Sequence, residues 1–244
     1  MVNKIKRIQF VISGKDAQEF LQGQLTADIS SLAPDSWLPA AHCTPQGKVL
    51  ATMWVIKIAQ TFRLLLLKER AEFLEKRLKM FALHKDVQIS RDETTQLQSL
   101  SDNSRKVILE HSKLYLGGLG DLSSQALIQA EFVEIYAETA DQFLPQMLGL
   151  EKNGGLSYQK GCYIGQEAIA RAHYKGGIKR HLARLTGSTP TVLGEVLKVG
   201  DYPAAIVLQS AIIEENYIAL AVLQDRYRDS ELVSDRGEAF TVIE

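Results

Sequence analysis

The residues best suited to chemistry are concentrated in one glycine-rich segment, residues 153–173. Its centre reads Lys160-Gly161-Cys162-Tyr163-Ile164-Gly165-Gln166-Glu167, and Arg171 follows. Glycine permits positive φ and close backbone approach, whereas the residues from Gln166 onward favour a helix, so Cys162 is predicted to lie in a tight turn just before a helix. Helix amino termini and nearby lysines or arginines lower the pKa of a cysteine thiol. Cys162 is therefore a candidate reactive thiol.

A structural role for Cys162 stays open, because free cysteines are among the most buried residues of proteins. The other cysteine, Cys43, lies in an apolar run typical of a core strand, and for it we favour the structural role. A Cys/His hydrolase with His173 as the base is disfavoured, because about two and a half helical turns would separate the two side chains. No second cysteine or paired histidine stands near Cys162 at ligand spacing, so no metal site is predicted.

A second candidate is the basic stretch from Arg171 to Arg184, which contains no acidic residue. Lys175, Lys179 and Arg180 lie within it. Such a stretch could bind phosphates, RNA or a polyglutamate tail, and the alternative is a solvated connector between domains. From the charges alone, direct nucleic-acid binding is a candidate without further support.

The scaffold for these residues is predicted to be an α+β front half followed by an all-β tail. Bulky and β-branched runs predict strands, and apolar periodicity with outward i,i+4 charge pairs predicts helices. In the front half, the predicted strands are residues 5–12, 37–43, 49–59, 62–67, 85–90, 106–110 and 113–116, and the predicted helices are 16–21, 69–83 and part of 122–136. Residues 91–104 are polar and are predicted to form a loop or an internal boundary.

The tail begins after a junction near Gly176-Gly177 and reads as a small, closed β-domain. Its short apolar runs are residues 180–186, 192–199, 204–208, 217–223 and 239–243, separated by turn-forming residues.

Length and composition set limits on the class of protein. The chain has 244 residues, of which 28 are basic and 29 acidic, so its net charge of −1 gives no overall attraction to nucleic acid or to an anionic membrane. Two cysteines are too few for a disulfide framework, which favours a reducing compartment. Neither a signal peptide nor an apolar run of the roughly 20 residues needed to span a bilayer is evident. We therefore expect a cytoplasmic protein without a membrane partner.

Three segments resemble the YgfZ family, the folate-binding relatives of the glycine-cleavage T-protein. The segment from Lys160 to Glu167, with Arg171, is similar to the family signature K-G-C-Y-x-G-Q-E-x-x-x-R. Phe20-Leu21-Gln22-Gly23-Gln24-Leu25-Thr26-Ala27-Asp28 is similar to its amino-terminal F-L-Q-G-Q-L-T-x-D block. Pro45-Gln46-Gly47-Lys48 is similar to its strand-turn segment. The likeness extends over most of the chain.

The resemblance implies a T-protein-like fold, in which two ferredoxin-like α+β regions and a carboxy-terminal β-barrel surround a central hole that takes tetrahydrofolate. We accordingly expect a first region from 1–44 and 105–176, a second from 45–104 and the barrel at 177–244. The family supports iron–sulfur enzymes, notably the radical enzyme that methylthiolates tRNA, and relies on the motif cysteine. By resemblance, Cys162 carries that role here. The residues expected to shape its surroundings are Lys160, Gly161, Tyr163, Gly165, Gln166, Glu167 and Arg171.

Several positions depart from the family or its superfamily. T-proteins place an acidic residue where this chain has Ala51-Thr52, and neither residue can act as an acid or base near neutral pH, so aminomethyl transfer is disfavoured. Relatives carry tryptophans at the positions of Arg7 and Ser123, and an E-A-G segment where this chain reads Gln129-Ala130-Glu131. We therefore predict no individual folate contacts. A folate-dependent one-carbon enzyme and an RNA- or protein-binding module remain the alternatives.

Overall fold

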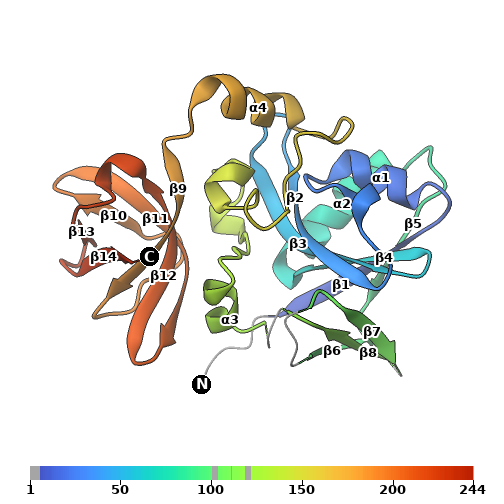
Figure 1. The fold of residues 1–244 in the computed structure, drawn as a ribbon, viewed down its shortest axis with the longest axis horizontal. Helices are drawn as coiled ribbons and strands as arrows, with labels where there is room; N and C mark the ends of the chain where they lie inside the picture. The colour runs from blue at the N-terminus through green and yellow to red at the C-terminus, as the bar shows by residue number, and fades with distance from the viewer. Residues whose placement is uncertain (1–5, 101–103, 111, 119–121, 244) are drawn as a thin grey trace.

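The computed structural model describes residues 6–100, 104–110, 112–118 and 122–243, and it consists of two halves that lie side by side (Figure 1). An α+β half contains two sheets, and a closed barrel forms the other half. The segment that includes α3 runs between them, and α4 bridges the two halves at one end (Figure 1). This is the predicted architecture of an α+β front and a β-barrel tail.

The main sheet of the front half has five antiparallel strands in the order β2-β3-β4-β1-β5. The strands are β1 (Arg7–Ser13), β2 (Ser36–Cys43), β3 (Val49–Ile58), β4 (Thr61–Leu67) and β5 (Gln88–Asp92). Pairing of Pro39 with Trp54 and of Phe10 with Leu64 sets the register. The predicted hairpin from 37 to 59 is thus confirmed.

Both faces of this sheet are buried, which explains why β2 and β3 read as nearly continuous apolar runs. Helices α1 (Ala17–Gln24) and α2 (Ala71–Phe81) cover one face, where Leu74 and Leu78 join the core that contains Phe10. The alternating charges on the exposed side of α2 pair as predicted, with Glu72–Lys76 at 2.9 Å. The opposite face, which includes Trp54, packs against the middle of the chain.

A small sheet of order β6-β8-β7 follows, and it corrects the prediction that residues 91–104 form a loop. Its strands are β6 (Gln96–Ser99), β7 (Val107–Glu110) and β8 (Lys113–Leu116). Strand β6 has only Leu97 as a large apolar residue, and its pairing partner is the distant β8, so no local pattern marked it as a strand. The hairpin of β7 and β8 was predicted; His111 in its turn lies outside the described residues.

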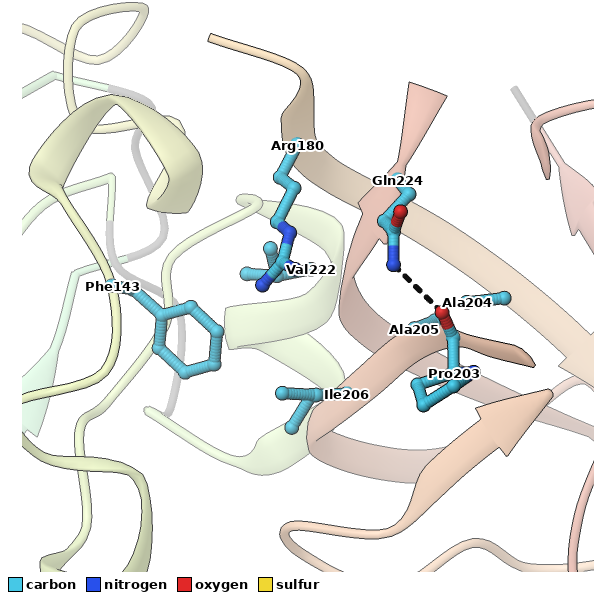
Figure 2. Close-up of a pocket in the computed structure, with 8 residues that line it drawn as sticks. All are labelled: Phe143, Arg180, Pro203, Ala204, Ala205, Ile206, Val222 and Gln224. Carbon is cyan, nitrogen blue, oxygen red and sulfur yellow. Dashed lines mark hydrogen bonds between the residues drawn. The ribbon is translucent and has the colours of Figure 1, made fainter. Parts of the chain in front are cut away.

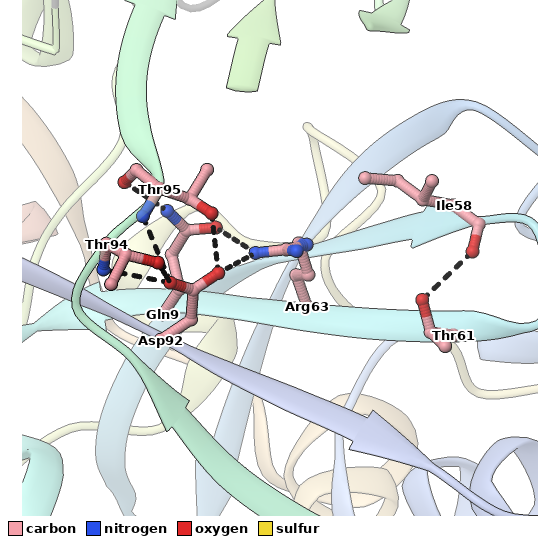
Figure 3. Close-up of polar contacts among 7 residues, drawn as sticks. All are labelled: Gln9, Ile58, Thr61, Arg63, Asp92, Thr94 and Thr95. Atoms are coloured by element: carbon pink, nitrogen blue, oxygen red, sulfur yellow. Dashed lines mark hydrogen bonds and ion pairs between the residues drawn. The ribbon is translucent and has the colours of Figure 1, made fainter. Parts of the chain in front are cut away.

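Side chains fasten the turn between β5 and β6 to the main sheet (Figure 3). Arg63 donates to Asp92 over 2.6 Å and to the amide oxygen of Gln9 over 3.0 Å. Thr94 and Thr95 donate to the same Asp92 carboxylate. Burial acts to raise the pKa of Asp92, but the hydrogen bonds from Thr95 and Arg63 outweigh it and hold that pKa far below its usual value.

The middle of the chain is mostly irregular. It contains α3 (Ser124–Gln129), short 3₁₀ turns and α4 (Gln166–Arg171), which continues directly into a π-helix, Ala172–Gly176. Within the described residues, the 3₁₀ turns are Ile29–Ser31, Lys68–Arg70, Ala137–Thr139, Pro145–Leu148 and Asp225–Tyr227. The helix predicted within 122–136 is therefore a short one.

The barrel closes in the order β10-β11-β12-β9-β14-β13. Its strands are β9 (Arg180–Gly187), β10 (Val196–Val199), β11 (Tyr202–Ile213), β12 (Asn216–Gln224), β13 (Leu232–Val233) and β14 (Ala239–Ile243). Five of them match predicted runs, and the two-residue β13 was not predicted. All lie within the expected region 177–244. In the front half, the expected boundary between residues 44 and 45 falls in the β2–β3 turn, and its division into two regions stays a prediction.

One apolar core joins the two halves. Trp54 of the sheet, Phe132 and Leu148 of the middle segment, and Leu208 and Leu220 of the barrel belong to a single cluster of buried residues. The rings of Trp54 and Phe132 stack with centroids 4.3 Å apart. The barrel also has its own inner core. Within the described ranges, no helix has the length and apolar character needed to cross a membrane.

Candidate functional site

Cys162 lies in the turn that precedes α4, as predicted, and its side chain is exposed. Cys43 lies at the end of β2 and is completely buried. Burial raises the pKa of the Cys43 thiol well above its ordinary value, so this cysteine stays protonated and behaves as a core residue. The chain thus presents one accessible thiol.

Lys160 anchors the turn that carries Cys162. Its side chain is buried, and its ammonium group donates to the backbone oxygens of Leu25 and Ala27, both over 2.7 Å. The same nitrogen lies 4.7 Å from the centroid of the Tyr163 ring. Burial lowers the pKa of Lys160 to about 8, against the opposing charge of Asp28.

Backbone hydrogen bonds extend this junction with the amino-terminal block. The amide of Ser157 donates to the Thr26 oxygen over 3.0 Å, and the amide of Ile164 donates to the Gly23 oxygen over 3.2 Å. In return, the Thr26 hydroxyl donates to the Gly155 oxygen over 2.6 Å. The loop from 153 to 165 is therefore held on both sides of Cys162 by residues more than a hundred positions earlier.

The amino-terminal block is itself braced by side chains. Gln22 donates to Asp28 over 2.8 Å and accepts from the amide of Ile29 over 2.7 Å. His42 is fully buried; its Nδ1 lies 3.0 Å from the Gln24 oxygen, and its Nε2 accepts from Arg77 over 3.1 Å. Burial lowers the pKa of His42 to about 4, so the neutral ring fits this position.

The third motif segment meets the cysteine turn through two glycines. Gly165 has φ 86°, and a Cβ there would lie 2.5 Å from the Thr44 oxygen and 2.9 Å from the Cα of Gly47. Gly47 has φ 78°, and its own Cβ would lie 2.9 Å from the Ile169 side chain of α4. Only glycine allows the two turns to approach this closely. The three motif segments therefore converge on one junction, below the exposed thiol.

The other motif residues divide into buried and exposed ones. Tyr163 is buried, and burial raises its pKa well above the ordinary value. Gln166 donates to the backbone oxygen of Lys160 over 3.4 Å, while Glu167 and Arg171 are exposed and form no ion pair with another described residue. Gly161 is exposed, with open space where a Cβ would be.

His173 is not placed to act as a base for the Cys162 thiol. Its ring stacks on Tyr158 with the centroids 4.1 Å apart, and no hydrogen bond joins Cys162 to a histidine within the described part of the chain. The described residues also contain no cluster of three or more metal-ligating side chains.

At the centre of the molecule, where the resemblance implies a folate site, two charged side chains form a buried pair. Arg7 forms a bidentate ion pair with Glu134, at 2.6 and 2.8 Å, and both are almost completely buried. The Arg7 guanidinium lies 5.7 Å from the Trp54 ring. The hydroxyl of Thr52 accepts from the amide of Ile135 over 3.0 Å. These contacts link the sheet to the middle segment.

A small cavity remains between the middle segment and the barrel (Figure 2). Its volume is about 40 Å³, with Phe143 on one side and Arg180, Ile206 and Val222 among the residues opposite. That space takes a few water molecules, whereas sites for larger organic ligands measure roughly 300–1,000 Å³. A cavity of about 380 Å³ opens elsewhere, between the β1–α1 turn and the β3–β4 hairpin, and no motif residue lines it. A third cavity, of about 160 Å³, is lined by Arg7, Gln9 and Asp92 among other residues, and like the first it is smaller than a site for such a ligand.

Three features of the structure were not predicted from the sequence. Arg7 was noted only as a departure from the family, although Glu134 in the apolar run from 132 to 135 signals a buried charge that needs a partner. Ser123 caps α3 by accepting from the amide of Ala126 over 3.2 Å, and Gln129 is exposed at the end of that helix. The bracing role of His42 carried no local signal.

Comparison with known proteins agrees with this architecture. No family model matches the chain. The tRNA-modifying protein YgfZ of Hamiltonella defensa is 26% identical, with 93% of this chain and 84% of that protein covered, and YgfZ of Escherichia coli O157:H7 is 29% identical over 88% and 82%. An uncharacterized protein of Haemophilus influenzae is 35% identical over 69% of this chain and 67% of its own length.

Among solved structures, the aminomethyltransferase T of the glycine cleavage system from Bartonella henselae matches with a TM-score of 0.73. The match covers 98% of this chain and 83% of that one at 13% identity, and it establishes the fold. Together with the three converging motif segments, these relatives show that the chain is similar to YgfZ proteins over most of its length and has the fold of the glycine-cleavage T-protein.

Proposed function

We propose that this chain is a YgfZ-like accessory protein that supports tRNA modification in the cytoplasm, with Cys162 as its functional thiol. The observation that carries the proposal is the contrast between the two cysteines. Cys43 is sealed in the core, whereas Cys162 is exposed on a turn that Lys160 and Gly165 hold in place. A thiol in a braced and open position suits contact with another macromolecule.

We further propose that the partner is an iron–sulfur enzyme, such as the radical enzyme that methylthiolates tRNA. The family resemblance supports this choice of client. The exposed side chains of Glu167 and Arg171, on the helix that follows the thiol, offer one acidic and one basic contact for such a partner. No step of the client's chemistry is assigned to this chain.

Substitution in the native host tests the thiol. Methylthiolated nucleosides in total tRNA are quantified by mass spectrometry in a strain that lacks the gene and carries either wild type, Cys162→Ser or Cys43→Ala. We expect Cys162→Ser to reduce methylthiolation to the level of the empty strain, and Cys43→Ala to retain it, with immunoblots confirming equal protein levels. Full methylthiolation with Cys162→Ser, in a host where the wild type is required, would refute the role of this cysteine.

Tetrahydrofolate binding is a separate proposal that rests on the family resemblance. The buried Arg7–Glu134 pair and the small cavities of about 40 and 160 Å³ give it no support, so no step of the function passes through folate. Titration calorimetry of the purified protein with tetrahydrofolate tests it. Saturable heat would establish folate as a ligand, and the absence of binding would remove both this ligand and the alternative of a folate-dependent one-carbon enzyme.

A further inference from the structure

A cluster of three aromatic rings flanks the cysteine turn in the sequence: His173 and Tyr174 are exposed, and Tyr158 is partly buried against the core. Tyr158, from the turn segment, stacks on His173, and Tyr174 meets the two rings edge-on with centroids 6.2 Å from Tyr158 and 4.7 Å from His173. The Tyr174 side chain is 70% exposed. Large aromatic rings are normally placed in cores or at interfaces, so a ring exposed to this extent on an aromatic stack is a candidate contact surface.

The cluster has one acidic contact, because the Tyr158 hydroxyl donates to the Glu151 carboxylate over 3.1 Å, and the basic side chains near it are without ion pairs. Arg171, Lys175 and Lys179 are exposed, and none forms an ion pair with another residue that the structure describes. Arg171 lies three residues before Tyr174 and Lys175 one residue after it, where α4 passes into the π-helix. Most other exposed lysines on helices of this chain behave differently: Lys76 and Lys79, for example, are neutralised by Glu72 and Glu75. The positive charge around Tyr174 is therefore left available.

The position of this surface relates it to Cys162. Tyr158 lies four residues before the cysteine, and α4 begins four residues after it and ends at Arg171. A helix of that length spans about 9 Å. The rings and the charges therefore lie on the chain segments that directly flank the thiol.

We propose that the surface formed by Tyr158, Arg171, His173, Tyr174, Lys175 and Lys179 binds a single-stranded segment of RNA. This inference deepens the proposed function and rests on it for the biological identity of the RNA. Exposed aromatic rings stack on unpaired bases, and arginines and lysines neutralise the adjoining phosphates, which is the combination that single-stranded nucleic acids require. A protein partner would favour an apolar centre, whereas the ring cluster here lies among charges.

In the resulting arrangement, a base stacks on the free face of Tyr174, and the phosphates on either side contact Arg171 and Lys175. Lys179 extends the positive track toward the barrel. Three phosphate contacts on a single strand give a slope of about −2 in log affinity against log salt, so affinity falls about 20-fold between 50 and 200 mM salt. Loss of one stacked base weakens binding about 10-fold.

Fluorescence anisotropy of the purified full-length protein with a labelled 12-nucleotide mixed-sequence RNA tests the charges. We expect the triple variant Arg171→Gln/Lys175→Gln/Lys179→Gln to lose most of the salt dependence. Its matched control is Lys76→Gln/Lys79→Gln/Lys113→Gln, three exposed lysines outside the surface, which should bind like the wild type. Wild-type binding without salt dependence, or equal binding by the two triple variants, would overturn the proposal.

A second pair of variants tests stacking. Tyr174→Ala should weaken binding about 10-fold with an unchanged salt slope, and Tyr174→Phe should restore it within about twofold. Tyr202 on the barrel is 66% exposed, so Tyr202→Ala is the control and should bind normally. Equal loss in both alanine variants would refute a specific role for Tyr174, as would equally tight binding to polyglutamate or to anionic vesicles, which lack bases.

The test separates this inference from the proposed function. Cys162→Ser should bind RNA like the wild type while failing to support methylthiolation. If the wild type binds no RNA at 50 mM salt, the RNA surface is refuted, and the loss of methylthiolation with Cys162→Ser still stands for the thiol. If RNA binds but Cys162→Ser modifies tRNA normally, the surface stands and the thiol's role is lost.

Discussion

Replacing Lys160 by methionine tests how the cysteine turn is held. Methionine retains an unbranched apolar side chain but leaves the buried oxygens of Leu25 and Ala27 without their donor, and each unsatisfied group costs about 1–3 kcal/mol. Methionine also avoids the burial of a charge. The lowered pKa of about 8, against about 10.5 for a free lysine, makes that charge cost on the order of 3 kcal/mol at pH 7. The loss of the two hydrogen bonds costs slightly more free energy than the removal of the buried charge returns. We therefore expect Lys160→Met to be less stable than the wild type by about 1 kcal/mol at pH 7.

The pH dependence gives this prediction its sharpest form. Between about pH 8 and pH 10.5 the unfolded chain binds a proton on Lys160 that the folded chain has released, so wild-type stability rises with pH through this window. The variant has no such group. The difference in unfolding free energy between wild type and variant should therefore widen by on the order of 1 kcal/mol from pH 7 to pH 9.

Urea unfolding followed by circular dichroism at both pH values measures this difference. The control is Lys152→Met, which removes an exposed lysine just before this loop and should change stability by less than about 0.5 kcal/mol at either pH. Hydrogen exchange at the backbone amides of Leu25 and Ala27 reports local opening of the segment that Lys160 anchors, and it should accelerate only in Lys160→Met. A variant as stable as wild type at both pH values, or a difference that narrows with pH, would contradict the assignment.

Three further substitutions probe the surrounding structure. Gly165→Ala should destabilise the protein by about 2–4 kcal/mol in thermal unfolding, because its φ is positive and its Cβ would strike the facing turn, whereas Gly161→Ala, with open space around it, should be nearly neutral. The unfolding free energy of the wild type should fall by on the order of 2 kcal/mol from pH 6.5 to pH 4, because His42 binds a proton in the unfolded chain but stays neutral in the folded one. In urea titrations, His42→Gln should remove most of that fall. Glu134→Leu should cost about 3–5 kcal/mol by leaving Arg7 buried without a partner, and the double change with Arg7→Met should recover most of it; equal stability of single and double variants would refute the pairing.

Local sequence patterns predicted much of the fold. Alternating and continuous apolar runs predicted the strands of the main sheet and most of those of the barrel. They did so because the apolar side chains of these strands form the hydrophobic cores of the two halves. The glycines and helix formers around Cys162 placed the cysteine in a turn before a helix. Strand β6 was not predicted, because its composition is polar and its extended conformation depends on pairing with β8.

The sequence predicted the motif residues of the site but not their contact partners. The motif identified Lys160, but its partners Leu25 and Ala27 lie 135 and 133 positions away, a separation at which no periodicity links residues. The pairing of Arg7 with Glu134 spans 127 positions and depends on packing that brings the first strand beneath the middle segment. Such contacts follow from the closed fold rather than from any local stretch of the chain.

The single core that joins the sheet, the middle segment and the barrel limits how the molecule can move. Domains that open around a ligand usually meet through a polar and easily separated interface, about which a hinge can turn. Here Leu208 and Leu220 of the barrel are buried in the same cluster as Trp54 and Phe132, so hinge opening would expose core residues to water. The two halves therefore behave as one cooperative unit, in which a barrel deprived of the front half would lose part of its own hydrophobic core.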